Sequence, residues 1–263
     1  MTEKKKGPHT SNQSTEKALK VMELLAASRL PMRLRDISET LGLNSSTTLR
    51  FLSSLQECGY VAQDENQRYY PTYKICRIAN QISSHIELQS VTHPYLLQLA
   101  EQFEEAICVS VEQNMTMVYV DVASNPGRTL LSIQRVGNSS PMHCTGNGKL
   151  LLLNYSEEQI DTLIRCKGLP RFTENTITTK ERLMEELEKI READISYDNE
   201  ECEAGVRCIA CPIRDYTNTI VAGISVTGPV SRMDNETIRR FYGPLRETTA
   251  HISEILGADY FNN

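Results

Sequence analysis

Hydrophobic residues recur at helical spacing in three short segments near the start of the chain, and each segment predicts an amphipathic helix. The first helix begins near Ser14. The second helix ends at Gly42, since glycine readily takes the left-handed conformation that terminates helices. Asn44 can cap the third helix, which runs to about Cys58. The residues expected to face inward are Ala18, Val21, Met22 and Leu25, then Leu34, Ile37 and Leu41, and in the third helix Leu49, Phe51, Leu52 and Leu55. The opposite face of the third helix is polar.

A short β-hairpin is predicted next, from segments 60–63 and 68–72, which flank a polar stretch. Asn66 is the turn residue best able to adopt a positive φ, and Pro71 ends the second strand. Hydrophobic residues over 75–86 then return to helical spacing and predict a helix that joins this region to the rest of the chain.

From about Ser90 the pattern changes to strands interleaved with capped helices. Pro94 is placed for the first turn of a helix. The predicted strands cover 107–112, 115–122, 130–136, 206–213 and 220–227, while the helix starts are marked by Ser156 with Gln159, by Thr178 with Glu181 and by Asp234. Paired strands separated by helices indicate an α+β fold with an antiparallel sheet flanked by helices.

These patterns divide the chain into four parts. We expect a disordered polar tail over 1–13, a helical domain with a hairpin over 14–73, called the head, a linker helix over 74–89, and a larger domain over 90–263, called the body.

Composition supports a globular protein with two folded units, since the chain has 263 residues of which 40% are hydrophobic. No apolar run is long enough to cross a bilayer and the first residues lack a hydrophobic signal core, so we expect a cytoplasmic protein with no membrane partner. Eight cysteines in such a protein are expected to be reduced thiols. The net charge is −6, but residues 1–73 hold ten basic and eight acidic residues, which leaves the body acidic.

The head has the order of elements of a winged helix-turn-helix, with the third helix as recognition helix and the hairpin as wing. Small polar residues at the start of that helix can approach base edges, and Arg50, one turn further, can reach a guanine edge or a phosphate. The residues expected to contact double-stranded operator DNA are Arg33, Arg35, Asn44, Ser45, Ser46, Thr47, Arg50, Gln67 and Arg68. A charge of +2 per head implies weak binding by one copy, so we expect the protein to dimerise. The alternative is a plain three-helix bundle with a solvated polar face.

In the body, the glycine-rich segment 145–149 precedes an apolar helix start. It does not match the phosphate-binding P-loop, but its bare backbone N–H groups suit a carboxylate or a phosphate; a tight turn is an equal alternative. Strand alternation places Ser225 and Thr227 on one face, and Cys208 on one face with Ala210. These side chains either line a pocket or are interior groups bonded to the backbone.

Cys208 and Cys211 form one CxxC pair. A structural zinc site usually needs two such pairs, and neighbours three apart on a strand point to opposite faces, which also argues against a redox pair. We therefore expect packed cysteines, no metal, no cofactor and no catalytic residues, since a nucleophile motif is missing as well.

Taken together, these motifs resemble the IclR family of bacterial transcription regulators over about 14–257. The segment 44–52 stands where the recognition helix of that family begins, and 141–149, 205–212 and 224–229 are similar to its body motifs. The resemblance implies a GAF-like body that binds a small organic acid, and dimers or tetramers. It also implies effector contacts by Gly146, Asn147, Asp198, Cys208, Ser225 and Thr227.

Two residues depart from the family pattern: Asn147 replaces a small apolar residue, and Asn66 stands for the usual wing glycine. Asp198 carries a charge that would repel a carboxylate, so we expect it to accept a hydrogen bond from a ligand hydroxyl or a bound water. The hypothesis is a ligand-responsive repressor of a catabolic operon, in which the acid changes the spacing of two recognition helices through the helix over 75–86. The alternative is a metabolite-binding module or enzyme whose head serves assembly.

Overall fold

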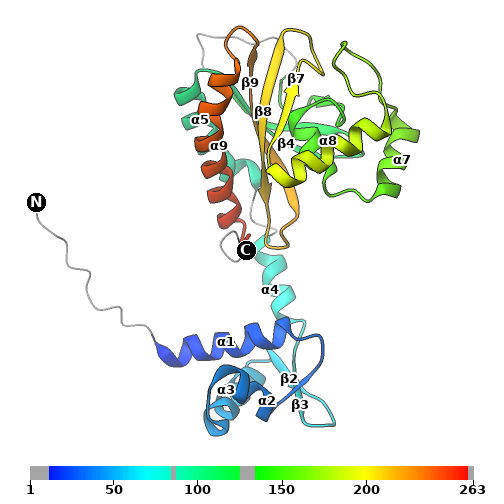
Figure 1. Ribbon diagram of the computed structural model, residues 1–263. Coiled ribbons are helices and arrows are strands. Elements are labelled where there is room, and N and C mark those ends of the chain that lie inside the picture. Colours follow the sequence, from blue (N-terminus) through cyan, green and yellow to red (C-terminus); the bar gives the residue numbers. More distant parts are fainter. Residues whose placement is uncertain (1–11, 84–86, 125–133, 260–263) are drawn as a thin grey trace, which may run out of the picture. The chain divides into compact units, whose positions relative to one another are not determined.

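The computed structural model describes residues 12–83, 87–124 and 134–259, and the chain divides into two compact units, Met1–Ile86 and Glu87–Asn263 (Figure 1). The first unit contains α1 (Gln13–Ala27), β1 (Met32–Arg33), α2 (Leu34–Leu41), α3 (Ser45–Glu57), β2 (Val61–Gln63), β3 (Arg68–Pro71) and α4 (Lys74–Ser83). Its three strands form one antiparallel sheet in the order β1-β3-β2. The predicted winged helix-turn-helix is therefore confirmed.

Local signals set the ends of the head helices as predicted. Gly42 ends α2 with φ 62°, and the side chain of Asn44 accepts a hydrogen bond from the backbone N–H of Thr47 at 2.8 Å. The buried core of the head is made of Val21, Met22, Leu25, Ile37, Phe51, Leu52, Val61 and Tyr69. Asn12 caps α1, and the helix therefore begins at Gln13, one residue before the predicted start at Ser14.

Two predictions about the head are wrong. In the wing it is Gln67, not Asn66, that has a positive φ, of 60°. The carboxylate of Asp64 accepts hydrogen bonds from the backbone N–H groups of Asn66 and Arg68, which closes the turn around them. In α3, Leu49 is 43% exposed, because the inward arc runs through Thr48 and Phe51 instead.

The second unit contains α5 (Leu88–Phe103), β4 (Ala106–Glu112), β5 (Met117–Ala123), β6 (Ser139–Ser140), α6 (Gly146–Leu152), α7 (Glu157–Lys167), α8 (Lys180–Ala193), β7 (Ser196–Asn199), β8 (Val206–Arg214), β9 (Ile220–Pro229) and α9 (Asn235–Ile255). The strands form one antiparallel sheet in the order β6-β5-β4-β9-β8-β7. Helices α5 and α9 cover one face and α6, α7 and α8 lie on the other (Figure 1). This is the α+β arrangement predicted for the body, an antiparallel sheet flanked by helices.

Several details of the body differ from the sequence prediction. Pro94 lies inside α5, because Leu88 and Val91 pack against the core and extend the helix upstream. Thr179, not Thr178, caps α8. Of the strand expected over 130–136, residues 130–133 lie outside the described residues, and residues 134–136 do not form a strand. The next strand in the chain is β6. The capping box of Ser156 and the cap at Asp234 are confirmed.

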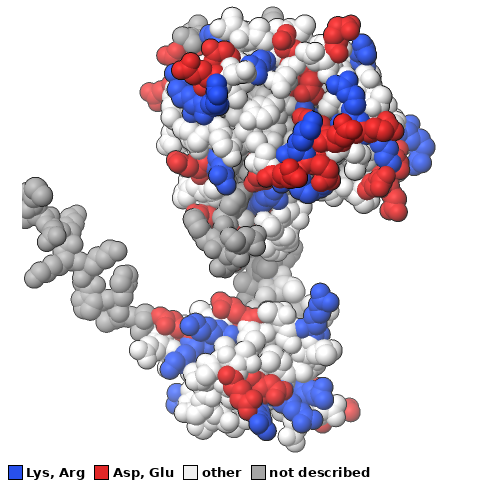
Figure 2. Space-filling model, viewed as in Figure 1, with Lys and Arg blue, Asp and Glu red and all other residues white. Residues whose placement is uncertain are grey.

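Basic and acidic side chains are interspersed over the face of both units shown in Figure 2, including the surface of α7 and α8. Ion pairs on that surface, such as Lys180 with Asp161 at 2.6 Å, account for part of this pattern. Among the helices of the described ranges, none combines the length and apolarity needed to cross a membrane.

Candidate functional site

The residues expected to contact DNA lie on β1, on α2, on α3 and its cap, and in the wing. Most are exposed, and Thr47 and Arg68 are partly buried; the full set is Arg33, Arg35, Asn44, Ser45, Ser46, Thr47, Arg50, Gln67 and Arg68. Asn44 and Ser46 take part in the helix cap, since the Ser46 hydroxyl donates to the Asn44 side chain at 3.0 Å. Of the other members of this set on α3, Ser45 and Arg50 are exposed, as is Leu49, while Thr47 is partly buried.

The structure brings two basic residues of this set together. Arg33 on β1 and Arg68 on β3 are direct partners in the antiparallel pair, although 35 positions separate them in the chain. Like charges directly opposite one another are unfavourable in a sheet unless an anion lies nearby. Arg35, in contrast, forms an exposed ion pair with Glu39 at 2.7 Å, which is weak enough to yield to a phosphate.

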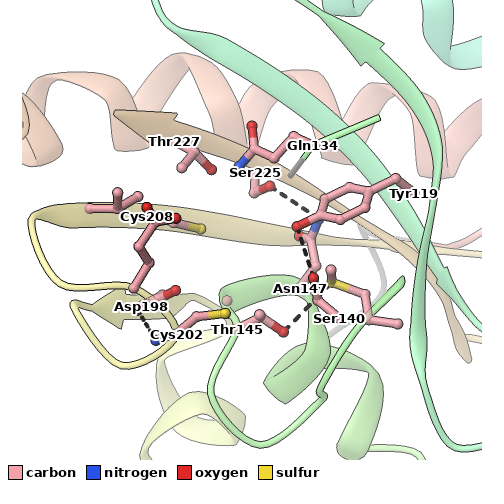
Figure 3. A pocket seen from close by; sticks show the side chains of 14 residues that line it. Tyr119, Gln134, Ser140, Thr145, Asn147, Asp198, Cys202, Cys208, Ser225 and Thr227 are labelled. Carbon is pink, nitrogen blue, oxygen red and sulfur yellow. Dashed lines mark hydrogen bonds between the residues drawn. The ribbon is translucent and has the colours of Figure 1, made fainter. Parts of the chain in front are cut away.

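In the body, the six residues expected to contact an effector all line one cavity of about 60 Å³. Figure 3 shows the side chains of Asp198, Cys208, Ser225 and Thr227 directed toward a common space. The strand register explains this convergence, because Asp198 on β7 pairs with Cys208 on β8, and Cys208 pairs with Thr227 on β9. One short row across three strands therefore supplies three of the six residues.

Helix α6 forms part of the cavity wall and approaches the sheet closely. A β-carbon at Gly146 would lie 2.8 Å from the Cys208 sulfur, so only glycine permits this approach. Asn147 lies in the lining but also fastens α6 to the sheet, since its Nδ2 donates to Ser110 and Ser225 at 3.1 Å each. A side chain at Gly223 would collide with the Asn147 amide. The polar replacement at 147 is thus a tether between α6, β4 and β9.

Asp198 is only 6% exposed, and its Oδ1 accepts hydrogen bonds from the backbone N–H groups of Glu201 and Cys202. Burial raises the pKa of Asp198 to about 7; the backbone hydrogen bond from Glu201 opposes the shift, and the Glu201 charge adds to it. A carboxyl group with this pKa is partly protonated at neutral pH. The expectation that Asp198 would repel a carboxylate therefore needs correction, because the neutral acid can donate a hydrogen bond.

A buried ion pair lies beside Asp198 and was missed by the sequence analysis. Lys149 is fully buried in α6, and its ammonium is 2.6 Å from Glu201 and 3.2 Å from Glu186. Burial raises the pKa of Glu201, against the lowering effect of Lys149. The sequence offers one local signal for the burial of Lys149, which is that four leucines follow it directly.

Thr145 of the glycine-rich segment and Val206, on the strand face of Cys208, also line the cavity. The lining residues that were missed are Met117, Tyr119, Gln134, Ser140, Cys202 and Glu203. Alternation along β5 could have indicated Met117 and Tyr119, which share a face of that strand. None of the described lining residues is a lysine, arginine or histidine.

The positions of Cys208 and Cys211 agree with the prediction that residues three apart on a strand point to opposite faces of the sheet. Cys208 lies in the apolar cluster on the α6 side of the sheet, and Cys211 lies in the cluster on the α9 side. All eight cysteines are free thiols. Within the described ranges, histidine, cysteine and carboxylate side chains form no cluster that could hold a metal ion.

A winged helix-turn-helix domain, linked in the chain to a sheet domain whose cavity carries several polar side chains, is the arrangement of a DNA-binding regulator that can take a ligand. The IclR helix-turn-helix domain matches residues 14–65, and the C-terminal domain of bacterial transcriptional regulator IclR matches residues 80–254. The chain belongs to the IclR family of bacterial, DNA-binding transcriptional regulators.

Individual relatives agree with this assignment. The transcriptional repressor IclR of Escherichia coli is 30% identical over 232 residues, which cover 87% of this chain and 84% of that protein. The crystal structure of Thermotoga maritima IclR has 26% identity and a TM-score of 0.62, covering 93% of this chain and 98% of that one. A PobR inducer-binding domain from Acinetobacter, solved as a double mutant with 3-hydroxybenzoic acid, has 26% identity and a TM-score of 0.61, covering 65% and 99%.

Proposed function

We propose that this regulator is a ligand-responsive repressor of a catabolic operon in the cytoplasm, and that a small organic acid, bound in the body cavity, is its effector. The observation that supports the effector site is the convergence of Gly146, Asn147, Asp198, Cys208, Ser225 and Thr227 on one cavity. The DNA contacts are proposed for the residues of β1, α2, α3 with its cap, and the wing named above, in a homodimer or homotetramer.

The cavity favours a short effector. A water-sized group needs roughly 10 to 15 Å³, so a volume of about 60 Å³ has room for about four to six such groups. This is less than the 3-hydroxybenzoic acid in the PobR domain structure requires. We infer an acid of a few carbons.

The chemistry of the lining indicates how an acid is held without a cation. The hydroxyls of Ser225 and Thr227 can donate to a carboxylate, and so can the protonated form of Asp198. A ligand anion beside Asp198 would favour that protonated form further. Binding therefore takes up a proton when the pH lies above about 7.

A metabolite-binding enzyme is the second candidate, and the cavity gives it little support. Burial raises the pKa of the Cys208 thiol to about 12, which keeps this potential nucleophile protonated. No histidine base lies among the described lining residues. We propose that the site binds without catalysis.

Two measurements test the DNA half. Duplexes are first selected by the purified protein from a random-sequence pool, and affinities for the enriched duplex are then compared. Arg50→Ala is expected to weaken binding by at least about fivefold, because a guanine or phosphate contact is lost. Arg165→Ala on the exposed surface of α7 is the matched control and should leave affinity unchanged. Failure to enrich any sequence, with salt-insensitive retention on heparin, would favour a head that serves assembly.

The effector half is tested by thermal shift against a panel of short carboxylic acids, since a ligand of the folded state raises the apparent melting temperature. Thr227→Val should abolish the shift produced by the best acid and leave duplex binding intact. An equal shift in the variant would contradict the proposed site.

A further inference from the structure

Leu49 is the one aliphatic side chain among the exposed positions of α3, all of which is described. Its neighbours on the helix at spacings of three and four are Ser45, Ser46 and Ser53, which are exposed, and Leu52, which is buried. Leu49 is therefore an exposed apolar side chain among serines, at the edge of the polar face of α3.

The core of the head does not account for Leu49. Helix α3 packs against α1, α2 and β2 through its other side, where Thr48, Phe51 and Leu52 are buried. Leu49 does not belong to the apolar cluster of the head. The Leu49 side chain is thus free to contact a molecule that binds to the exposed face of α3.

Duplex DNA offers one apolar group to a helix in its major groove, the C5 methyl group of thymine. The base-facing side of a recognition helix normally reads hydrogen-bonding groups, and Ser45, Ser46 and Arg50 are suited to that. An aliphatic side chain on the same face has no hydrogen bond to offer, so it can distinguish bases only through that methyl group.

We propose that Leu49 packs against a thymine methyl group and makes α3 prefer an A·T pair at one position of each half-site. This inference rests on the proposed role of α3 as the recognition helix. Leu49 is then a specificity-determining residue, in addition to the polar residues proposed to contact the duplex.

The test uses the duplex enriched from a random-sequence pool, remade with each thymidine replaced in turn by deoxyuridine, which lacks only the methyl group. Wild-type protein should bind about fourfold more weakly when the contacted thymidine is replaced, the effect of one buried methyl group. Leu49→Ala should show no preference between thymidine and deoxyuridine there. Leu19→Ala, which shortens another exposed leucine of the same unit, should keep the wild-type preference.

The outcomes separate this inference from the proposed function. If wild type is insensitive to every replacement, or Leu49→Ala keeps the wild-type ratio at every position, Leu49 does not read a methyl group although α3 still binds DNA. If Arg50→Ala also leaves the affinity for the duplex unchanged, the role of α3 itself is wrong. Equal melting temperatures of Leu49→Ala and wild type show that the exposed substitution leaves the fold intact.

Discussion

The backbone of Gly146 passes the side chain of Cys208 so closely that a β-carbon on Gly146 would lie 2.8 Å from the Cys208 sulfur and 3.1 Å from the β-carbon of Ala210. Real β-carbons do not approach backbone-anchored neighbours to this extent, so the start of α6 lies against β8 only because residue 146 is glycine. Both residues line the cavity of the body.

Gly146→Ala should displace α6 and destabilise the body by about 1 to 3 kcal/mol, the usual effect of overpacking. Urea unfolding measures the stability, and a thermal-shift assay measures the loss of the effector response. Cys208→Ala removes the colliding sulfur, so the double variant should recover part of the stability lost in Gly146→Ala. Strict additivity of the two substitutions would show that the contact does not limit the approach of α6.

Lys149→Met should destabilise the protein by about 3 kcal/mol or more, because Glu201 would keep a buried charge without its partner. Unfolding by urea at neutral pH is the measurement. Lys180→Met is the matched control, since this lysine pairs with Asp161 near the surface, where such a pair contributes less than about 1 kcal/mol. Adding Glu201→Gln to Lys149→Met should restore part of the lost stability.

Asp198 makes stability depend on pH in a defined direction. Its pKa of about 7 in the fold lies well above that of an unfolded carboxyl group, so between these values the folded state holds the extra proton and stability falls as the pH rises. Asp198→Asn cannot lose a proton. The melting temperature of this variant relative to wild type should therefore rise from pH 5 to pH 7 and level off above about pH 8. A constant difference across this range would contradict the raised pKa.

Thiol labelling should follow burial. Cys58, Cys76 and Cys166 are exposed and are expected to react with iodoacetamide in the native protein, whereas Cys208 should react only after unfolding. The reason is twofold, since Cys208 is buried and burial raises its pKa to about 12. Mass spectrometry of the peptides gives the labelled positions. Rapid native labelling of Cys208 would show that the cavity opens readily to solvent.

The helices of the head were predictable because their signals are local. Gly42 takes the left-handed conformation and Asn44 caps α3 for reasons contained in a few neighbouring residues. The wing turn shows where local reasoning ends. Asn66 has the better intrinsic preference for positive φ, but the hydrogen bonds of the Asp64 carboxylate place that conformation at Gln67.

For the body, strand alternation correctly placed Ser225 with Thr227 and separated Cys208 from Cys211, because side-chain direction along a strand is a local property. Which strands are neighbours is not local, so the row from Asp198 to Cys208 to Thr227 required the sheet order and its register. The burial of Lys149 and the raised pKa of Asp198 have the same origin. Both depend on how much water the surrounding elements exclude, and that is a property of packing between distant parts of the chain.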